Sequence, residues 1–179
     1  MSKKLLFRLA VLVAAMMCAL GASAAEFEAY ACYTSGNTTL TFYYDNQRYD
    51  RHLANSYSYD LNTGKNIPGW HTDGVYENVT WVVFDPAFTL ARPTTTYMWF
   101  DGMEELEYID CLRYLNTSEV TDMERMFHNC DNLQYLDGIY NFDTRNVTDM
   151  GYMFYGCNGL TSLDLSSFIE RQICRRGRL

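Results

Sequence analysis

The sequence has little positive charge and only three prolines. Of its 179 residues, 14 are Lys or Arg and 22 are Asp or Glu, which gives a formal net charge of −8. Contact with phosphates needs clustered Lys and Arg, so this balance argues against nucleic-acid binding. Apolar residues make up 48% and charged residues 20%. These proportions are typical of a folded chain and exclude an intrinsically disordered one.

No apolar run is long enough to cross a membrane as a helix. The longest, residues 9–20, has 12 residues, whereas a span needs about 20. A basic N-terminal segment precedes this run and the small residues 22–24 follow it. This is the order of a secretory signal peptide. We predict that residues 1–24 are a signal peptide cleaved after Ala24 or Ala25. The mature chain is then exported to the cell surface, the periplasm or the medium, without a transmembrane segment.

The sequence lacks the spaced Cys and His sets that bind metals. It has no CxxC and no Cys/His group with zinc spacing. Five cysteines follow the signal peptide, an odd number that leaves at least one thiol unpaired and the pairing open. We interpret most of them as small buried apolar residues. His52, His71 and His128 form no metal or triad motif, so we predict no cofactor and no metal site.

A 27-residue repeat organises the second half. Residues 99–125 align with 126–152 at nine identical positions, and the tetrapeptide Val-Thr-Asp-Met recurs at 120–123 and 147–150. A third copy starts at Met153, and a degenerate one starts near Val79. Such a period indicates supersecondary units that bury a core only by stacking on their neighbours.

Each repeat shows one strand pattern and one helix pattern. Leu163 and Leu165 alternate as in a half-buried strand. Apolar residues at helical spacing follow Val147, and Thr121 with Glu124 is a capping-box pair at the start of the predicted helix. The sequence therefore predicts an α/β fold: a short leucine-rich-repeat solenoid over residues 79–168, with one strand plus one short helix per repeat.

Two segments of the repeats carry a family resemblance. Asn146-Val-Thr-Asp-Met-Gly-Tyr-Met-Phe-Tyr-Gly-Cys157 and Leu160-Thr-Ser-Leu-Asp-Leu-Ser-Ser-Phe168 resemble repeats of BspA-like leucine-rich repeat surface proteins of Bacteroides-type bacteria. Residues 40–45 and 59–64 are similar to the region before the repeats in such proteins. The resemblance implies surface display and adhesion, including binding to host matrix proteins, and does not imply catalysis.

The segments that flank the repeats differ from them. Residues 29–33 and 39–44 are β-prone runs separated by Ser35-Gly36-Asn37, a hairpin signal, so residues 25–78 are predicted to be a β-rich N-terminal capping region. Residues 169–179 depart from the repeat and hold four arginines. We interpret them as an atypical basic tail, for which a truncated reading frame is one explanation.

The candidate binding residues recur every 27 positions. Asp110, Asp137 and Asp164 each follow a predicted inward-facing residue, so their side chains should point outward from the stacked strands. The predicted outer face combines them with three further positions, and its members are Tyr108, Asp110, Tyr135, Asp137, Ser162 and Asp164. The acidic ladder is either a solvated surface or a site for a Lys/Arg-rich partner or a cation such as Ca²⁺.

These patterns favour a non-catalytic binding protein. We expect an exported bacterial surface protein that mediates adhesion or protein–protein binding. Its partner would be a host or bacterial surface protein, with extracellular-matrix proteins as candidates. Two alternatives stay open: a gene fragment without independent function, and a secreted glycan hydrolase. The acidic pair Glu104/Glu105 suggests the latter, but Asp131 and Asn132 replace it one repeat later.

Overall fold

The computed structural model describes residues 26–52 and 55–169. The predicted signal peptide, residues 1–24, lies outside the described residues, and so does the predicted tail apart from Ile169. The strands are β1 (Glu28–Thr34), β2 (Thr39–Asp45), β3 (Ser56–Asp60), β4 (Trp81–Phe84) and β5 (Tyr108–Asp110), and the α-helices are α2 (Arg48–His52) and α3 (Gly69–Thr72). Short 3₁₀ helices span Val75–Asn78, Pro86–Leu90, Leu112–Tyr114 and Ile139–Asn141.

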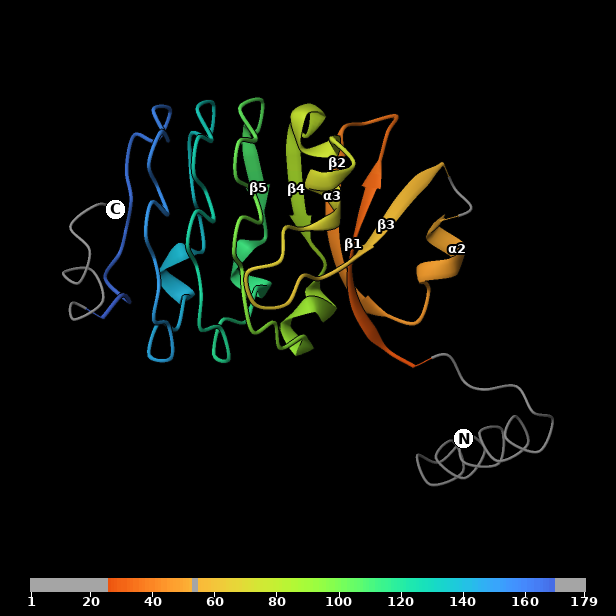
Figure 1. Cartoon of the computed structure of the whole chain (residues 1–179), viewed down its shortest axis with the longest axis horizontal. Coiled ribbons are helices and arrows are strands. Elements are labelled where there is room, and N and C mark those ends of the chain that lie inside the picture. The colour runs from red at the N-terminus through yellow and green to blue at the C-terminus, as the bar shows by residue number, and fades with distance from the viewer. Residues whose placement is uncertain (1–25, 53–54, 170–179) are drawn as a thin grey trace, which may run out of the picture.

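One mixed sheet joins the N-terminal segment to the first repeats. Its strand order is β3-β1-β2-β4-β5 (Figure 1). β1 pairs antiparallel with both β2 and β3, whereas β2–β4 and β4–β5 are parallel. The predicted hairpin is confirmed as β1 and β2, whose closing pair is Thr34 and Thr39. The sheet therefore continues from residues 28–60 into the repeats without a break.

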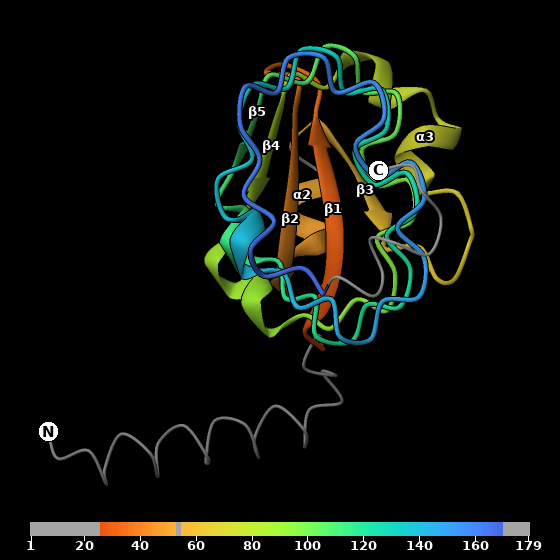
Figure 2. The ribbon, with the colours of Figure 1, turned by 90° about the vertical axis from the view of Figure 1, so that its left-hand side faces the viewer.

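From Thr95 onward the chain stacks in turns that follow the 27-residue period. Isolated parallel bridges join Thr95 to Asp122 and Asp122 to Asp149. The successive turns lie side by side along the long axis (Figure 1) and superimpose when viewed along it (Figure 2). Backbone hydrogen bonds link neighbouring turns, as from Phe100 N to Met126 O at 2.9 Å. None of the described helices has the length and apolar composition that crossing a membrane requires.

The predicted leucine-rich-repeat solenoid, with one strand plus one short helix per repeat, is wrong. The described residues hold a single five-stranded sheet with few helices, to which the repeats contribute only β4 and β5. The segments predicted as helices are turns, in which N–H groups that bond to the next repeat alternate with N–H groups that bond to carbonyls three residues back. Met98 N to Glu124 O, at 3.1 Å, is one such bond. These bonds satisfy backbone groups that a helix would have paired internally.

The predicted capping box at Thr121 and Glu124 is wrong for the same reason. Thr121 Oγ1 donates to the carbonyl of Thr94, at 3.2 Å, in the preceding repeat. Asp122 Oδ1 instead accepts the Glu124 N–H at 2.9 Å, which folds the backbone into a tight turn. Arg125 then adopts a left-handed φ of 58°, which ends any right-handed helix at that point.

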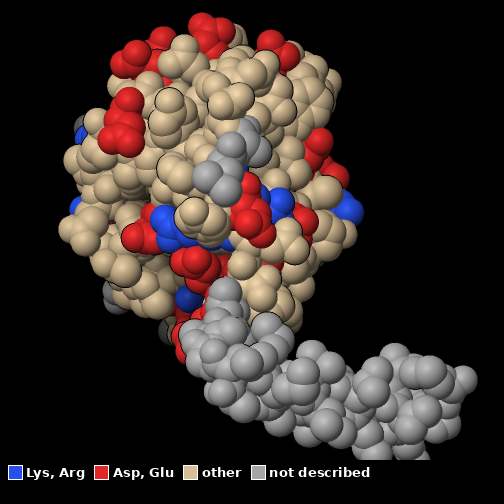
Figure 3. All heavy atoms as spheres, turned by 90° about the vertical axis from the view of Figure 1, so that its right-hand side faces the viewer, with Lys and Arg blue, Asp and Glu red and all other residues tan. Residues whose placement is uncertain are grey.

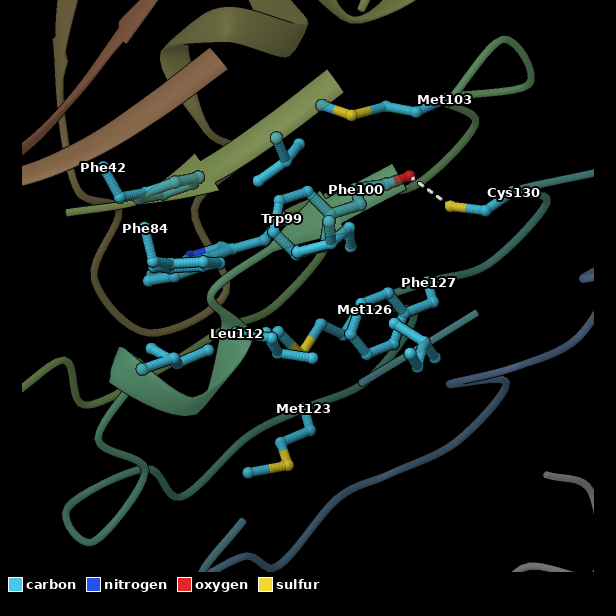
Figure 4. Packing of buried hydrophobic residues seen from close by; sticks show 14 of the residues in the cluster. Phe42, Phe84, Trp99, Phe100, Met103, Leu112, Met123, Met126, Phe127 and Cys130 are labelled. Carbon is cyan, nitrogen blue, oxygen red and sulfur yellow. Dashed lines mark hydrogen bonds between the residues drawn. The ribbon is translucent and has the colours of Figure 1, made fainter. Parts of the chain in front are cut away.

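Stacked aromatic rings fill the interior between the sheet and the turns (Figure 4). The Phe42 ring stacks on that of Phe84, with a centroid distance of 4.7 Å, and on that of Trp99 at 4.9 Å. Phe127 lies 5.4 Å from Phe100, one repeat away. It lies 5.6 Å from Phe154 in the other direction. Phenylalanines that are 27 residues apart in the sequence thus have neighbouring rings in the core.

The described cysteines Cys32, Cys111, Cys130 and Cys157 are free. The Cys130 thiol is fully buried and donates to the Phe100 carbonyl at 3.1 Å (Figure 4). Cys157, one repeat on, donates to Phe127 O at 2.9 Å. Burial raises the pKa of the Cys157 thiol to about 11, so it stays protonated at neutral pH. Cys32 and Cys130 agree with the interpretation as buried apolar residues, while Cys111 and Cys157 are partly exposed.

The aromatic stack gives a stability prediction. Phe127→Ala should lower the free energy of unfolding by about 3–5 kcal/mol, because it removes a fully buried ring and leaves a cavity between two neighbours. Leu90→Ala is the matched control: Leu90 is 60% exposed, so its loss should cost below about 0.5 kcal/mol. Urea denaturation followed by circular dichroism measures both. Equal losses would contradict the stacked core.

Candidate functional site

An exposed aromatic pair lies on the outer face of the sheet, over β4 and β5. Trp81 and Tyr108 are direct neighbours in the parallel register, and their ring centroids are 5.1 Å apart. Trp81 Nε1 donates to Asp110 Oδ2 at 3.0 Å. This bond fixes the indole and the carboxylate relative to each other. Trp81 keeps 38% of its surface exposed and Tyr108 is half-buried, so the pair offers two rings tilted by 41° beside the Asp110 carboxylate.

The other predicted site residues are exposed, but they do not lie on strands. Tyr135 is 55% exposed, and Asp137, Ser162 and Asp164 are exposed as well. Their segments are irregular, since the described strands end with β5. Gly138, with a φ of 97°, turns the chain directly after Asp137. The structure thus pairs Tyr108 and Asp110 with Trp81 on strands and leaves the later positions on loops of the following turns.

Trp81 was missed by the sequence reasoning, although a signal for it exists. It lies 27 residues before Tyr108, and Val83 lies 27 residues before Asp110. Extending the repeat alignment of the outward positions back to β4 would have identified the tryptophan. We call Trp81, Tyr108, Asp110 and Tyr135 the outer row.

Two of the three aspartates of the predicted acidic ladder accept hydrogen bonds from within the chain. Asp110 accepts the Trp81 indole N–H, and Asp164 Oδ1 accepts the Ser166 N–H at 3.0 Å. Hydrogen bonds from the Ser166 side chain and backbone hold the pKa of Asp164 below its usual value. These partners agree with the interpretation of the ladder as a solvated surface.

A different set of carboxylates is close enough to share one cation. Oxygens of Asp122, Glu124 and Asp149 lie within 4.8 Å of one another. The repeat produces this cluster, because Asp122 and Asp149 occupy the same position of successive copies. Sequence reasoning missed this cluster, because the predicted helix start at Thr121 and Glu124 does not bring in Asp149 from the next repeat.

Lys65 fills this acidic cluster from a loop of the N-terminal segment. Its Nζ lies 3.3 Å from Asp149 Oδ2 and 3.6 Å from Asp122 Oδ2, and it also pairs with Glu124. Asn62 anchors the same loop, since its Oδ1 accepts the Trp99 indole N–H at 2.7 Å. The loop between β3 and α3 therefore crosses the repeats and supplies the cluster with a cation from within the chain.

The charges of the cluster shift its ionisation equilibria. A hydrogen bond to Glu124 and the charges of Asp122 and Asp149 raise the pKa of Lys65 above its ordinary 10.5. Burial raises the pKa of Asp122 above its ordinary 3.8, and the neighbouring carboxylates add to the effect while Lys65 opposes it. The ammonium thus stabilises a set of carboxylates that would otherwise repel one another.

Most described cations are already paired inside the molecule. Arg48 contacts Glu28 at 3.0 Å and also Asp60, and Arg51 pairs with Asp45. Figure 3 shows this end of the molecule, where the basic side chains in the middle lie directly beside acidic ones. Residues 25–168 contain seven basic and 21 acidic residues. The unpaired surface charge is consequently negative, which favours a cationic partner over an anionic one.

One comparison with known proteins gives a match. Residues 94–175 match the family described as "Mycoplasma protein of unknown function, DUF285". No curated protein and no solved structure matches the chain. The match covers the repeats from the segment before Trp99 onward, and it names no activity.

The expectation of a BspA-like leucine-rich repeat surface protein is wrong. The family that matches the repeats is DUF285. The expectation rested on residues 146–157 and 160–168, which both lie inside the matched range. A short repeat motif is set by which side chains pack against the next turn. Different families can share this packing requirement, so the motif does not distinguish between them.

The Lys65 cluster gives a pH-dependent prediction. Lys65→Met should lower the free energy of unfolding at pH 7 by about 1 kcal/mol, because it leaves three carboxylates without their shared cation. Because the pKa of Lys65 is raised, its ammonium stabilises the fold fully below pH 10.5 while the carboxylates are ionised, and this contribution is lost as the pH rises through the folded pKa. The difference between variant and wild type should also shrink below about pH 4, as the carboxylates become protonated.

Arg145→Met is the control, since Arg145 is 75% exposed and pairs with Asp143 alone, at 2.6 Å. Such a surface pair contributes little. Urea titrations at pH 3, 7 and 9 measure both variants. A loss for Lys65→Met that is the same at pH 3 and pH 7 would show that the charges of the cluster are not its cause.

Proposed function

We propose that the chain is an exported, non-catalytic protein of the bacterial surface that binds another protein through the outer row. The observation that carries the proposal is the Trp81–Tyr108 pair, which lies at the surface of a sheet with Trp81 38% exposed and hydrogen-bonded to Asp110. Tyr and Trp are enriched at protein interfaces and dominate their binding energy. The proposed partner is a host or bacterial surface protein, with extracellular-matrix proteins as the first candidates.

The position of the outer row supports this proposal physically. A binding residue on a sheet loses less conformational entropy on binding than one on a mobile loop. β4 and β5 hold Trp81 and Tyr108 through backbone pairing on both sides of β4. The Asp110–Trp81 bond restricts the indole further. The pair is therefore preorganised as an anchor for an apolar residue of a partner.

The binding test compares the aromatic pair of the outer row with an exposed tyrosine elsewhere on the molecule. The purified chain is applied to a panel of immobilised extracellular-matrix proteins, and the dissociation constant is measured by biolayer interferometry. The double variant Trp81→Ala/Tyr108→Ala should weaken binding by about tenfold or more, as expected for loss of an interface anchor. Asp137→Asn tests whether the loop carboxylate of the predicted ladder takes part.

Tyr49→Ala is the matched control, because Tyr49 is 75% exposed and lies on α2, away from β4 and β5. It should leave the dissociation constant within about twofold. Binding that the double variant retains in full would remove the outer row from the interface. Circular dichroism of each variant checks that its fold is intact.

Export is tested on the chain itself. Expression in a bacterial host should yield a secreted or periplasmic product that begins at Ala25 or Glu26, and mass spectrometry of the intact product measures this. Replacing Leu12 and Val13 by Asp should retain the uncleaved chain in the cytoplasm, because the apolar run would be interrupted. Export of this variant at the wild-type level would contradict the proposed signal peptide.

A further inference from the structure

Two adjoining cavities lie where the segment after α3 meets the first repeat. One has a volume of about 340 Å³ and is lined by Ile67, His71 and Met98 among others. The second, of about 270 Å³, is lined by Glu77, Glu104 and Glu105 among others. Tyr76 and Gly102 line both cavities, so the two adjoin, and we call them together the Tyr76 groove.

The backbone of the first repeat brings the Tyr76 ring to this position. Gly102 has a φ of 68°, and a Cβ at that residue would lie 3.4 Å from Tyr76 Cε2. The ring therefore lies against bare backbone. The His71 imidazole stacks on it, with a centroid distance of 4.7 Å and an interplanar angle of 20°. Tyr76 thus forms a fixed wall between an apolar cavity and an acidic one.

The apolar cavity suits an aliphatic side chain. Ile67 is 53% exposed at its edge, and Met98 offers a flexible thioether that adapts to different shapes. Burial lowers the pKa of His71, so the imidazole is neutral at pH 7 and adds no positive charge. Both cavities are at or below the lower end of the range for small-molecule sites, about 300–1,000 Å³. Each therefore fits one large side chain better than a cofactor.

The acidic cavity has no cation of its own. Over residues 26–52 and 55–169, no Lys or Arg nitrogen lies within 4.0 Å of the carboxylates of Glu77, Glu104 or Glu105. This is unlike the cluster at Asp122, which Lys65 neutralises. The charge of Glu77, with smaller effects of Asp101 and Glu104, raises the pKa of Tyr76. A negative field is thus concentrated at the ring.

We propose that the Tyr76 groove docks a segment of a partner protein that carries an aliphatic residue next to a Lys or Arg. The aliphatic side chain enters the cavity at Ile67 and Met98. The basic side chain enters the second cavity beside Tyr76, where Glu104 and Glu105 neutralise its charge. Charge complementarity selects this occupant, since three carboxylates here lack a cation and the body of the chain is strongly acidic.

The test is a selection from a displayed library of random heptapeptides on the purified full chain. Wild type should enrich peptides with an aliphatic residue within two positions of a Lys or Arg. Glu104→Gln/Glu105→Gln should weaken binding of an enriched synthetic peptide by about tenfold, since it removes two charges without changing shape. Ile67→Ser should weaken binding as well, but retain the preference for a basic residue.

Glu26→Gln/Glu119→Gln is the matched control, because it removes the same charge from exposed residues outside the groove. It should leave peptide affinity within twofold, and so should Trp81→Ala/Tyr108→Ala, which separates this site from the outer row. Enrichment without basic residues, or equal binding to the Glu104/Glu105 variant, would overturn the proposal. A dimer in sedimentation velocity that this variant abolishes would assign the groove to a second copy of the chain instead.

Discussion

Backbone hydrogen bonds between one 27-residue repeat and the next are the interaction on which the rest of the structure depends. Phe127 N bonds to Met153 O at 2.9 Å, as Phe100 N does to Met126 O one turn earlier. In each turn, N–H groups that bond to the next repeat alternate with N–H groups that bond within the turn, and unpaired groups in an interior are costly. Each turn therefore supplies hydrogen-bond partners for the backbone of its neighbour.

This pairing fixes where side chains lie both inside and outside. Residues one period apart become spatial neighbours, so Phe100, Phe127 and Phe154 form a column of rings in the core. The same register places Trp81 beside Tyr108 on the outer face of the sheet. The outer face made in this way is held by the same backbone pairing as the core behind it.

The charge of the chain is arranged around the same framework. The acidic cluster at Asp122 arises from the repeat, and the loop that carries Lys65 neutralises it while crossing the turns. The Tyr76 groove forms where the N-terminal segment meets the first repeat, and its glutamates have no such partner. The two acidic regions therefore differ: Lys65 pairs with the first, and no described Lys or Arg pairs with the glutamates of the second.

The sequence by itself determined the 27-residue period, the hairpin of β1 and β2 and the outward direction of Tyr108 and Asp110, because these follow from spacing along the chain. The tertiary structure alone decided that the repeats form turns instead of helices, since the hydrogen-bond partners lie one period away and no local pattern reveals them. It also decided the two places where distant segments meet. Lys65 reaches Asp149 across 84 residues, and Tyr76 lies against Gly102. Contacts of this kind depend on how the N-terminal segment folds over the repeats, which local propensity does not encode.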